Sequence, residues 1–306
     1  MAHIGRVVEQ MRKGGYFDRI MAAGPELARV RQFLRACAGD AVVPPVGGPL
    51  QRPDYPCFPG LRNKPWHQPQ VFEAVRMLEA AYPAIRDEAL QLQGHARLDY
   101  SRAARPWRSW LQPWTMLRPE VAPGTWTVYL FQHMGVDVEA VKACCPNTRA
   151  VINALPRVCT DYPWGDAIFS AMSARSHLRP HCSIDNLRVR IHLGLSIPEG
   201  CRIRVGAETR SWEEGRCLAF EDSFEHEVWN RSGTRRIVLI VDLWHPDLTD
   251  VEIEALTAGF RKAAVRRVFL RERIGITDAP QDYLPMIEAQ IERQDDDPLL
   301  RAYWNG

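Results

Sequence analysis

Hydrophobic and polar residues alternate along several short segments between residues 126 and 245. In the first, residues 126–131 (WTVYLF), every second side chain falls on the same face of an extended strand. Because turn signals separate such segments and no helical pattern intervenes, they predict an antiparallel sandwich or barrel. The further predicted strands are residues 187–195, 202–205, 216–220, 227–229 and 235–243.

Helical spacing is typical of the regions on either side of these strands. Residues 25–34 and 71–82 place apolar side chains three or four positions apart, and the chain turns helical again after Pro246. Residues 42–65 are rich in Pro and Gly and predict an irregular connection. We therefore expect an N-terminal helical region packed on the core (1–115), a β core (116–248) and a C-terminal helical tail (249–306).

The strand predicted at residues 187–195 (LRVRIHLGL) carries leucine, valine and isoleucine on one face. Arg188, Arg190 and His192 share the other face. If that face met solvent, the pattern would be that of an ordinary half-buried strand. If it lined the interior of a barrel, two guanidinium groups would form a site for a carboxylate, which arginine binds in bidentate fashion.

The strand predicted at residues 235–243 (RRIVLIVDL) begins with an arginine on an otherwise apolar face. Arg236 shares that face with Val238, Ile240 and Asp242. A charge in this position has to be exposed at the strand end or paired with an anion. Arg236 is therefore a second candidate residue for binding a carboxylate.

Two histidines precede these two strands in matching positions, 45 residues apart: His181 and His226. A lone histidine is usually structural, but two histidines beside arginines that could bind a carboxylate predict a metal site. Non-haem iron oxygenases bind iron through two histidines and one carboxylate. Ser183 stands where that carboxylate is expected, and Asp185, four residues after His181, would not project in the same way from an extended strand.

Composition and charge narrow the class of protein. The 306 residues are 46% hydrophobic and 25% charged with a formal charge of +2, so electrostatics does not indicate a nucleic-acid or membrane partner. Eight cysteines without a CxxC pair make a zinc ribbon or redox motif unexpected. The N-terminus does not resemble a signal peptide, and the longest apolar run, 237–241, is too short to span a bilayer. We expect a cytoplasmic protein with reduced thiols; the oligomeric state is left open.

Six ordered blocks between Cys57 and Leu248 closely resemble the aspartyl/asparaginyl β-hydroxylase family. The resemblance implies a mainly β protein with flanking helices and a double-stranded β-helix core of the jelly-roll, cupin-like type. It also implies iron(II), 2-oxoglutarate as cosubstrate, and O2. The blocks are Phe58–Trp66, Ile85–Leu90, Cys145–Pro156, Pro180–Gly206, Trp212–Asn230 and Val241–Leu248.

The resemblance assigns roles to individual residues. His181 and His226 fall on the iron ligands of a family that lacks the carboxylate ligand, and Ser183 replaces a family glycine. Asp222 matches an aspartate outside the ligand shell, for which we expect a role in catalysis by holding a water on the iron. Arg188 matches a position that helps to hold substrate. The cosubstrate contacts fall on Ser170, Arg190, His192 and Arg236.

These observations predict hydroxylation of an unactivated C–H bond. The resemblance points to the β-carbon of an Asp- or Asn-like residue, or of an amino acid, in a peptide or small-molecule substrate. One alternative is halogenation at the same iron, since a centre without its carboxylate can accept a halide. Another is a non-catalytic barrel that binds a carboxylate ligand. His245 is more typical of a strand-end cap than of a metal ligand.

Overall fold

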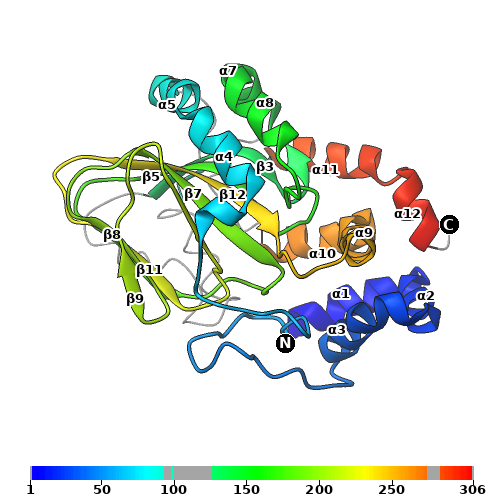
Figure 1. The fold of residues 1–306 in the computed structure, drawn as a ribbon. Coiled ribbons are helices and arrows are strands. Elements are labelled where there is room, and N and C mark those ends of the chain that lie inside the picture. The colour runs from blue at the N-terminus through cyan, green and yellow to red at the C-terminus, as the bar shows by residue number, and fades with distance from the viewer. Residues whose placement is uncertain (1, 93–97, 100–125, 274–282, 305–306) are drawn as a thin grey trace.

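The computed structural model describes residues 2–92, 98–99, 126–273 and 283–304. Two antiparallel sheets stand at its centre, with helices around them (Figure 1). All six predicted strands are present, with ends shifted by no more than two residues. The predicted class, mainly antiparallel sheet with flanking helices, is confirmed.

The larger sheet has eight strands, in the order β1-β10-β7-β12-β5-β3-β2, with β4 paired to β3. Every pairing between these strands is antiparallel. The strands are β1 (Trp66–His67), β2 (Leu98–Asp99), β3 (Trp126–His133), β4 (Val136–Asp137), β5 (Ala167–Met172), β7 (Arg188–Ser196), β10 (Cys217–Phe220) and β12 (Arg236–Trp244).

The smaller sheet has four strands in the order β6-β11-β8-β9. From β5 onward the chain passes repeatedly between the two sheets, so the residues that end one strand and begin the next lie where the sheets meet. The strands are β6 (Ser176–His181), β8 (Cys201–Val205), β9 (Glu208–Arg210) and β11 (His226–Asn230).

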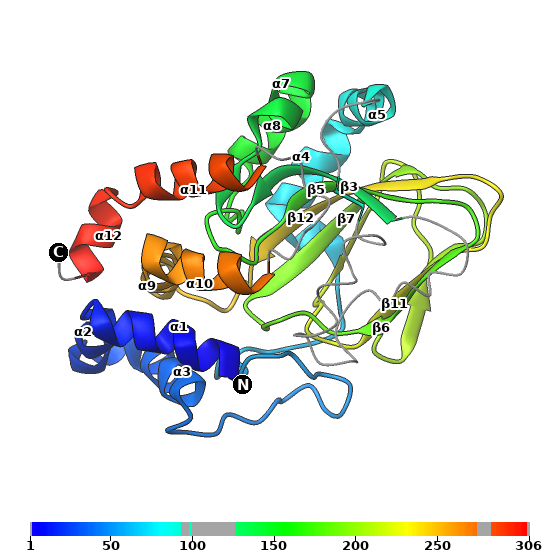
Figure 2. The same ribbon diagram turned by 180° about the vertical axis from the view of Figure 1, so that it is seen from behind.

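Helices flank the sheets in two groups (Figures 1 and 2). The first group, α4, α5, α7 and α8, lies along the larger sheet. It comprises α4 (Glu73–Ala80), α5 (Tyr82–Gln91), α7 (Glu139–Cys144) and α8 (Pro146–Ala154). The second group joins both ends of the chain: α1 (Ala2–Lys13), α2 (Tyr16–Ala22), α3 (Ala28–Ala38), α9 (Asp250–Arg261), α10 (Ala263–Arg273), α11 (Tyr283–Gln294) and α12 (Pro298–Tyr303). Two short 3-10 helices, η1 (Pro25–Leu27) and η2 (Pro69–Val71), precede α3 and α4.

The alternation along β7 decides what each face of the larger sheet contacts. Its apolar residues Val189, Ile191 and Leu193 are fully buried in one hydrophobic cluster with α4 and α5. Its polar face points between the sheets, where Arg188 is 2% and His192 4% exposed. The solvent-facing alternative for this strand is therefore wrong, and the polar face lines the interior.

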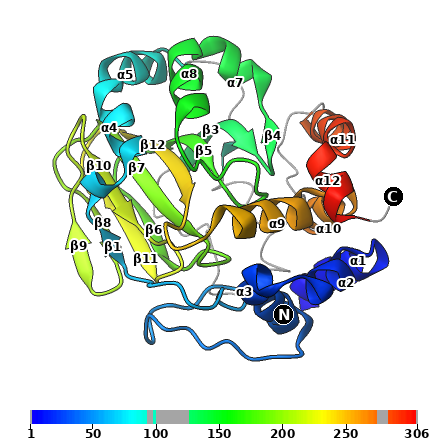
Figure 3. The same ribbon diagram turned by 45° about the vertical axis from the view of Figure 1, so that its right-hand side comes forward.

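The terminal helices share a second hydrophobic core (Figure 3). Helix α9 begins with a capping box, in which the Thr249 hydroxyl accepts from the Glu252 N–H and the Glu252 carboxylate accepts from the Thr249 N–H. The buried Glu252 carboxylate also pairs with Arg29 of α3. The predicted division at residue 115 lies outside the described residues, so the domain boundaries stay a prediction.

The irregular connection predicted at residues 42–65 follows α3 along the lower edge of Figure 1 and leads to β1 and α4. We call residues 47–67 the strap. It hydrogen-bonds to the loop after β6, where Tyr55 N–H donates to the Ile184 carbonyl at 2.8 Å. It also bonds to the loop before β11, where Glu225 N–H donates to the Leu50 carbonyl at 2.7 Å. The strap therefore holds two loops that are distant in sequence.

Candidate active site

His181 and His226 lie side by side in the smaller sheet. His181 ends β6, His226 begins β11, and the two residues are direct partners in the antiparallel pairing. Side chains of such partners share one face of a sheet. Their ring centroids are accordingly 4.1 Å apart. His226 is 5% exposed and His181 is half-buried, so this pair stands at the edge of the interior.

Both imidazoles are oriented in the same way. Nδ1 of His181 lies 2.7 Å from the Arg179 carbonyl oxygen, and Nδ1 of His226 lies 2.9 Å from that of Phe224. Because a carbonyl only accepts, these contacts assign the proton to Nδ1 and leave the Nε2 lone pair for a metal. Burial, the largest cause, lowers the pKa of both rings. They are therefore neutral near pH 7, the form that binds metals.

Among the described residues, no third His, Cys, Asp or Glu side chain joins this pair as a ligand. In the part of the chain that the structure describes, the one group of three His, Cys, Asp or Glu side chains with ligand atoms within 4.8 Å of one another lies elsewhere. The Ser183 hydroxyl is occupied, since Arg188 NH2 donates to it at 2.6 Å. Asp185 faces away, accepting from Tyr162 at 3.0 Å and from the Leu187 N–H at 3.0 Å.

Asp222 lies in the loop between β10 and β11 and is 1% exposed. Its Oδ2 is 3.2 Å from Arg190 NH1 and its Oδ1 is 3.7 Å from Arg188 NH2. Its backbone carbonyl accepts from the Ser183 N–H at 2.7 Å, which joins the loops that follow His181 and precede His226. The Asp222 charge raises the pKa of His181 against the larger effect of burial, so this carboxylate acts on His181 electrostatically.

Arg236 and His192 form a buried anion site between the sheets. Arg236 is 2% exposed, and its Nε and NH1 have no hydrogen-bond partner among the described residues. Both ring nitrogens of His192 are likewise buried without a partner. Burial lowers the pKa of Arg236 to about 10, so the group remains a cation at neutral pH.

Two tryptophans, which the sequence pattern did not indicate, complete this anion site. The Arg236 guanidinium lies 4.9 Å from the Trp212 ring centroid, and the His192 ring stacks on the same indole at 6.1 Å. The Ser170 hydroxyl accepts from Trp126 Nε1 at 2.9 Å. Ser170 and Arg236 lie on neighbouring strands β5 and β12 two register positions apart. The unpartnered donors therefore fit a carboxylate such as the distal one of 2-oxoglutarate.

The two arginines of β7 are occupied by aspartates. Arg190 binds Asp242 in bidentate fashion, through Nε at 2.8 Å and NH2 at 2.7 Å, and NH2 also reaches Asp166 at 2.8 Å. Arg188 donates to Asp242 at 3.2 Å and to the Trp164 carbonyl. Arg190 thus retains little donor capacity for a cosubstrate, and Arg188 is buried with its guanidinium bound to protein acceptors. Their predicted binding roles stay predictions.

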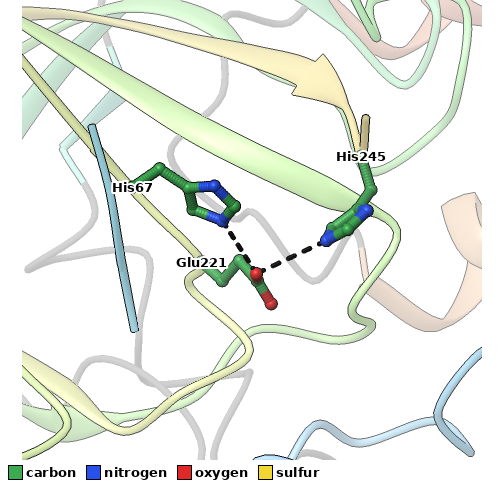
Figure 4. Close-up of side chains that lie close together, drawn as sticks. All are labelled: His67, Glu221 and His245. Carbon is green, nitrogen blue, oxygen red and sulfur yellow. Dashed lines mark hydrogen bonds and ion pairs between the residues drawn. The ribbon is translucent and has the colours of Figure 1, made fainter. Parts of the chain in front are cut away.

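A second cluster offers two histidines and one carboxylate (Figure 4). His67 Nε2 is 2.9 Å and His245 Nε2 is 3.5 Å from the same oxygen, Glu221 Oε1, and all three residues are buried. The donor set is that of an iron triad, but both Nε2 atoms face the same carboxylate oxygen, which accepts a hydrogen bond from His67. His181 and His226, beside the anion site, are therefore the better candidate metal centre.

Comparisons with known proteins identify one family. A family model described as aspartyl/asparaginyl beta-hydroxylase matches residues 79–246. The aspartyl/asparaginyl beta-hydroxylase of Mus musculus is 36% identical over 203 residues, which cover 65% of this chain and 26% of that protein, so the chain spans about a quarter of that relative. Human aspartate beta-hydroxylase domain-containing protein 1 is 33% identical over 249 residues, covering 80% of this chain and 60% of that protein.

Among solved structures, a prolyl-4-hydroxylase of Pseudomonas putida covers 53% of this chain and 98% of its own, with 14% identity and a TM-score of 0.27. A TM-score this low adds nothing to the assignment of the fold. Among the described helices, none has the length and apolar character needed to cross a membrane.

Proposed function

Because the chain belongs to the aspartyl/asparaginyl β-hydroxylase family, we propose that it is an iron(II)- and 2-oxoglutarate-dependent hydroxylase of an unactivated C–H bond. The observation that carries the proposal is the pairing of His181 with His226, whose Nδ1 atoms bind carbonyl oxygens and so leave the lone pair on Nε2. Beside them lies Arg236, whose Nε and Nη1 have no partner among the described residues. The passage of the chain between two sheets from β5 to β12 supports the double-stranded β-helix predicted for the core.

His181 and His226 would hold the iron through Nε2, and Arg236 with Ser170 would hold the distal carboxylate of the cosubstrate. His192 would lie beside the cosubstrate as a neutral imidazole, because burial, the largest cause, lowers its pKa well below the usual range. When bound, iron and 2-oxoglutarate supply the oxidation that inserts one atom of O2 into a C–H bond and yields succinate. The buried interior excludes water from that chemistry.

Two neutral imidazoles leave the full double charge of the iron in place, so the surrounding residues have to compensate it. Asp222 is the buried carboxylate whose charge acts on His181. We propose that it supplies part of the negative charge that a ligand carboxylate would otherwise bring. Arg190, which pairs with Asp222 at 3.2 Å, would set where that carboxylate points.

The proposed substrate is an Asp- or Asn-like residue or amino acid, free or in a peptide, oxidised at its β-carbon. A screen of amino acids and peptides with iron(II) and 2-oxoglutarate tests this, with succinate release and a product heavier by one oxygen as readouts. Substrate-dependent succinate release would exclude a merely carboxylate-binding barrel. Chloride in the same assay tests for halogenation, which the engagement of Ser183 by Arg188 does not specifically favour.

The ligand assignment predicts that His181→Ala and His226→Ala each lose tight iron(II) binding and reduce turnover at least about 100-fold. His177→Ala is the matched control. His177 lies on the same strand, but its Nε2 pairs with Glu227 at 2.9 Å and its ring stacks on Trp229 at 5.3 Å. Iron content and succinate release are the measurements. A metal-loaded His181→Ala protein that makes succinate at the wild-type rate would show that the assignment is wrong.

A further inference from the structure

Glu221 is fully buried, and its carboxylate accepts hydrogen bonds from three residues of the strap. Its Oε1 accepts from the Lys64 N–H at 2.9 Å and from His67 Nε2 at 2.9 Å, and its Oε2 accepts from Asn63 Nδ2 at 2.7 Å. His245 Nε2, at the end of β12, lies 3.5 Å from Oε1. Burial, the largest single effect, favours the neutral acid, but the nearby His245 and the hydrogen bonds from His67 and Lys64 together outweigh it and lower the pKa of Glu221. The carboxylate is therefore an ionised anchor for the strap.

The tautomer of His245 argues against a metal in this cluster. Its Nδ1 accepts a hydrogen bond from the Asp247 N–H at 3.1 Å, the bond of a strand-end cap. A neutral imidazole that accepts at Nδ1 carries its proton on Nε2. His245 Nε2 faces Glu221 at 3.5 Å (Figure 4), so this protonated nitrogen stands where a metal would need a lone pair. The cluster is therefore held together by hydrogen bonds to Glu221 and not by a metal.

A short chain of backbone contacts links Glu221 to the candidate iron ligand. The Phe224 N–H donates to the Glu221 carbonyl at 3.2 Å, and the Phe224 carbonyl accepts from His226 Nδ1 at 2.9 Å. Asp222 is the next residue after Glu221. Displacement of Glu221 would therefore move both the carbonyl that orients His226 and the carboxylate that compensates charge.

We infer that Glu221 is a positioning residue for the candidate metal centre: bonded to His67 and facing His245, it fixes the loop that carries Asp222 and His226. The inference rests on the proposed function, which assigns a metal to His181 and His226. Loss of an outer contact of a metal ligand typically weakens metal binding about 10- to 100-fold. An effect of that size is expected although Glu221 itself touches neither metal nor substrate.

Cobalt(II), which reports its ligand field in the visible spectrum, tests the inference on the full chain. In Glu221→Gln, one oxygen acceptor becomes a donor that opposes the surrounding donors. We expect cobalt(II) affinity about 10- to 100-fold below wild type and an altered spectrum. Glu88→Gln is the matched control, because Glu88 is also a buried carboxylate with several donors but caps α8, bonding to Asn147 and Thr148. It should lower stability and leave the spectrum unchanged.

Variants of His67 keep the test decisive if Glu221→Gln does not fold. His67→Ala removes one donor and should shift the cobalt spectrum in the same direction. His67→Gln restores a side-chain N–H donor and should return the spectrum towards wild type.

Three results would overturn the inference. One is a wild-type cobalt spectrum and affinity in both Glu221→Gln and His67→Ala. Another is two cobalt ions per wild-type chain that fall to one in His67→Ala, which would make the cluster a metal site. The third is a wild-type chain that binds no cobalt, which would overturn the proposed function as well. If cobalt binds but no substrate yields succinate with iron, the proposed activity alone fails, and the spectra still decide the role of Glu221.

Discussion

Arg236 carries a positive charge into the interior of the protein. It is 2% exposed, and burial lowers its pKa to about 10, with no carboxylate among the described residues to oppose that effect. A buried charge without a counter-ion destabilises the folded state, and replacing such a group by an apolar one of similar volume often stabilises a protein. Arg236 is therefore expected to destabilise the ligand-free protein, and a bound anion would offset this destabilisation.

Arg236→Met should raise the free energy of unfolding of the ligand-free protein by about 1–4 kcal/mol. The same change should abolish the rise in Tm that 2-oxoglutarate causes in wild type, because the partner of its carboxylate is gone. Thermal melts with and without cosubstrate measure both effects. Arg235→Met, at the exposed neighbouring position, is the control and should change neither. A destabilised Arg236→Met, or one that 2-oxoglutarate still stabilises, would contradict the anion-site assignment.

Sequence alternation predicted which charged side chains share a face but not their partners. Arg190 and Asp242 are direct register partners on β7 and β12 although they are 52 positions apart in the chain. That pairing depends on strand register, which alternation alone does not specify. The role of His67 could not be predicted either, because it depends on the pairing of the short strand β1 with β10 at the edge of the larger sheet. The histidine pair could be predicted from the sequence, because each histidine adjoins a strand with strong periodicity.

At the level of elements, strands with one apolar and one polar face were predicted and others were missed. Strand β5 (AIFSAM) is buried along its whole length, so it shows no alternation. Strand β6 (SHLRPH) contains a proline and two histidines, which make it a poor strand by composition. Helices α7 and α8 interrupt the predicted β core. The proline at the first turn of α8 was the available signal for its start.

The strap depends on the small size of Gly47. A Cβ at this position would lie 2.3 Å from Cζ and 2.6 Å from Cε1 of Phe224, the residue whose carbonyl orients His226. Such overlap with a buried ring has to be relieved by moving the strap or the loop. The packing of one strap residue is therefore coupled to the orientation of a candidate iron ligand.

Gly47→Ala should lower the free energy of unfolding by about 1–3 kcal/mol and weaken metal binding. Gly5→Ala is the control, because nothing lies within 4 Å of its added Cβ in α1. That control should stabilise the protein by about 0.5–1 kcal/mol. Urea denaturation and a metal titration separate the two variants. Unchanged metal affinity in a destabilised Gly47→Ala would mean that the strap stabilises the fold but does not affect the metal centre.

At the scale of the whole molecule, the helices from the two ends of the chain pack against one another (Figure 3). Trp304 stacks on Tyr16 at 5.2 Å, and the Tyr16 hydroxyl donates to the Ala255 carbonyl at 2.6 Å. Gly14 leaves room for the indole, since a Cβ there would meet Trp304 at 2.4 Å. The N- and C-terminal helices therefore form one packed unit, an arrangement that local sequence patterns do not encode.

Trp304→Ala should lower the free energy of unfolding by about 3–5 kcal/mol, because it removes a buried indole. We expect iron affinity to stay close to wild type below the unfolding transition, since Trp304 belongs to the core of the terminal helices and not to that of the sheets. Chemical denaturation followed by metal titration measures both quantities. Trp304→Phe should recover much of the stability, and a lower metal affinity in either variant would show that the two cores are coupled.

The strap also determines when the candidate metal centre can form. Its contacts join residues far apart in the chain, 172 positions for Gln51 and Ser223 and 128 for Phe58 and Asn186. Contacts with such large sequence separation close late in folding, because chain entropy opposes them until other structure has formed. During synthesis, the strap leaves the ribosome long before its partners exist. A metal ion that met the nascent chain would therefore find two unconnected histidines, and the candidate pair would form only after β11 has paired with β6.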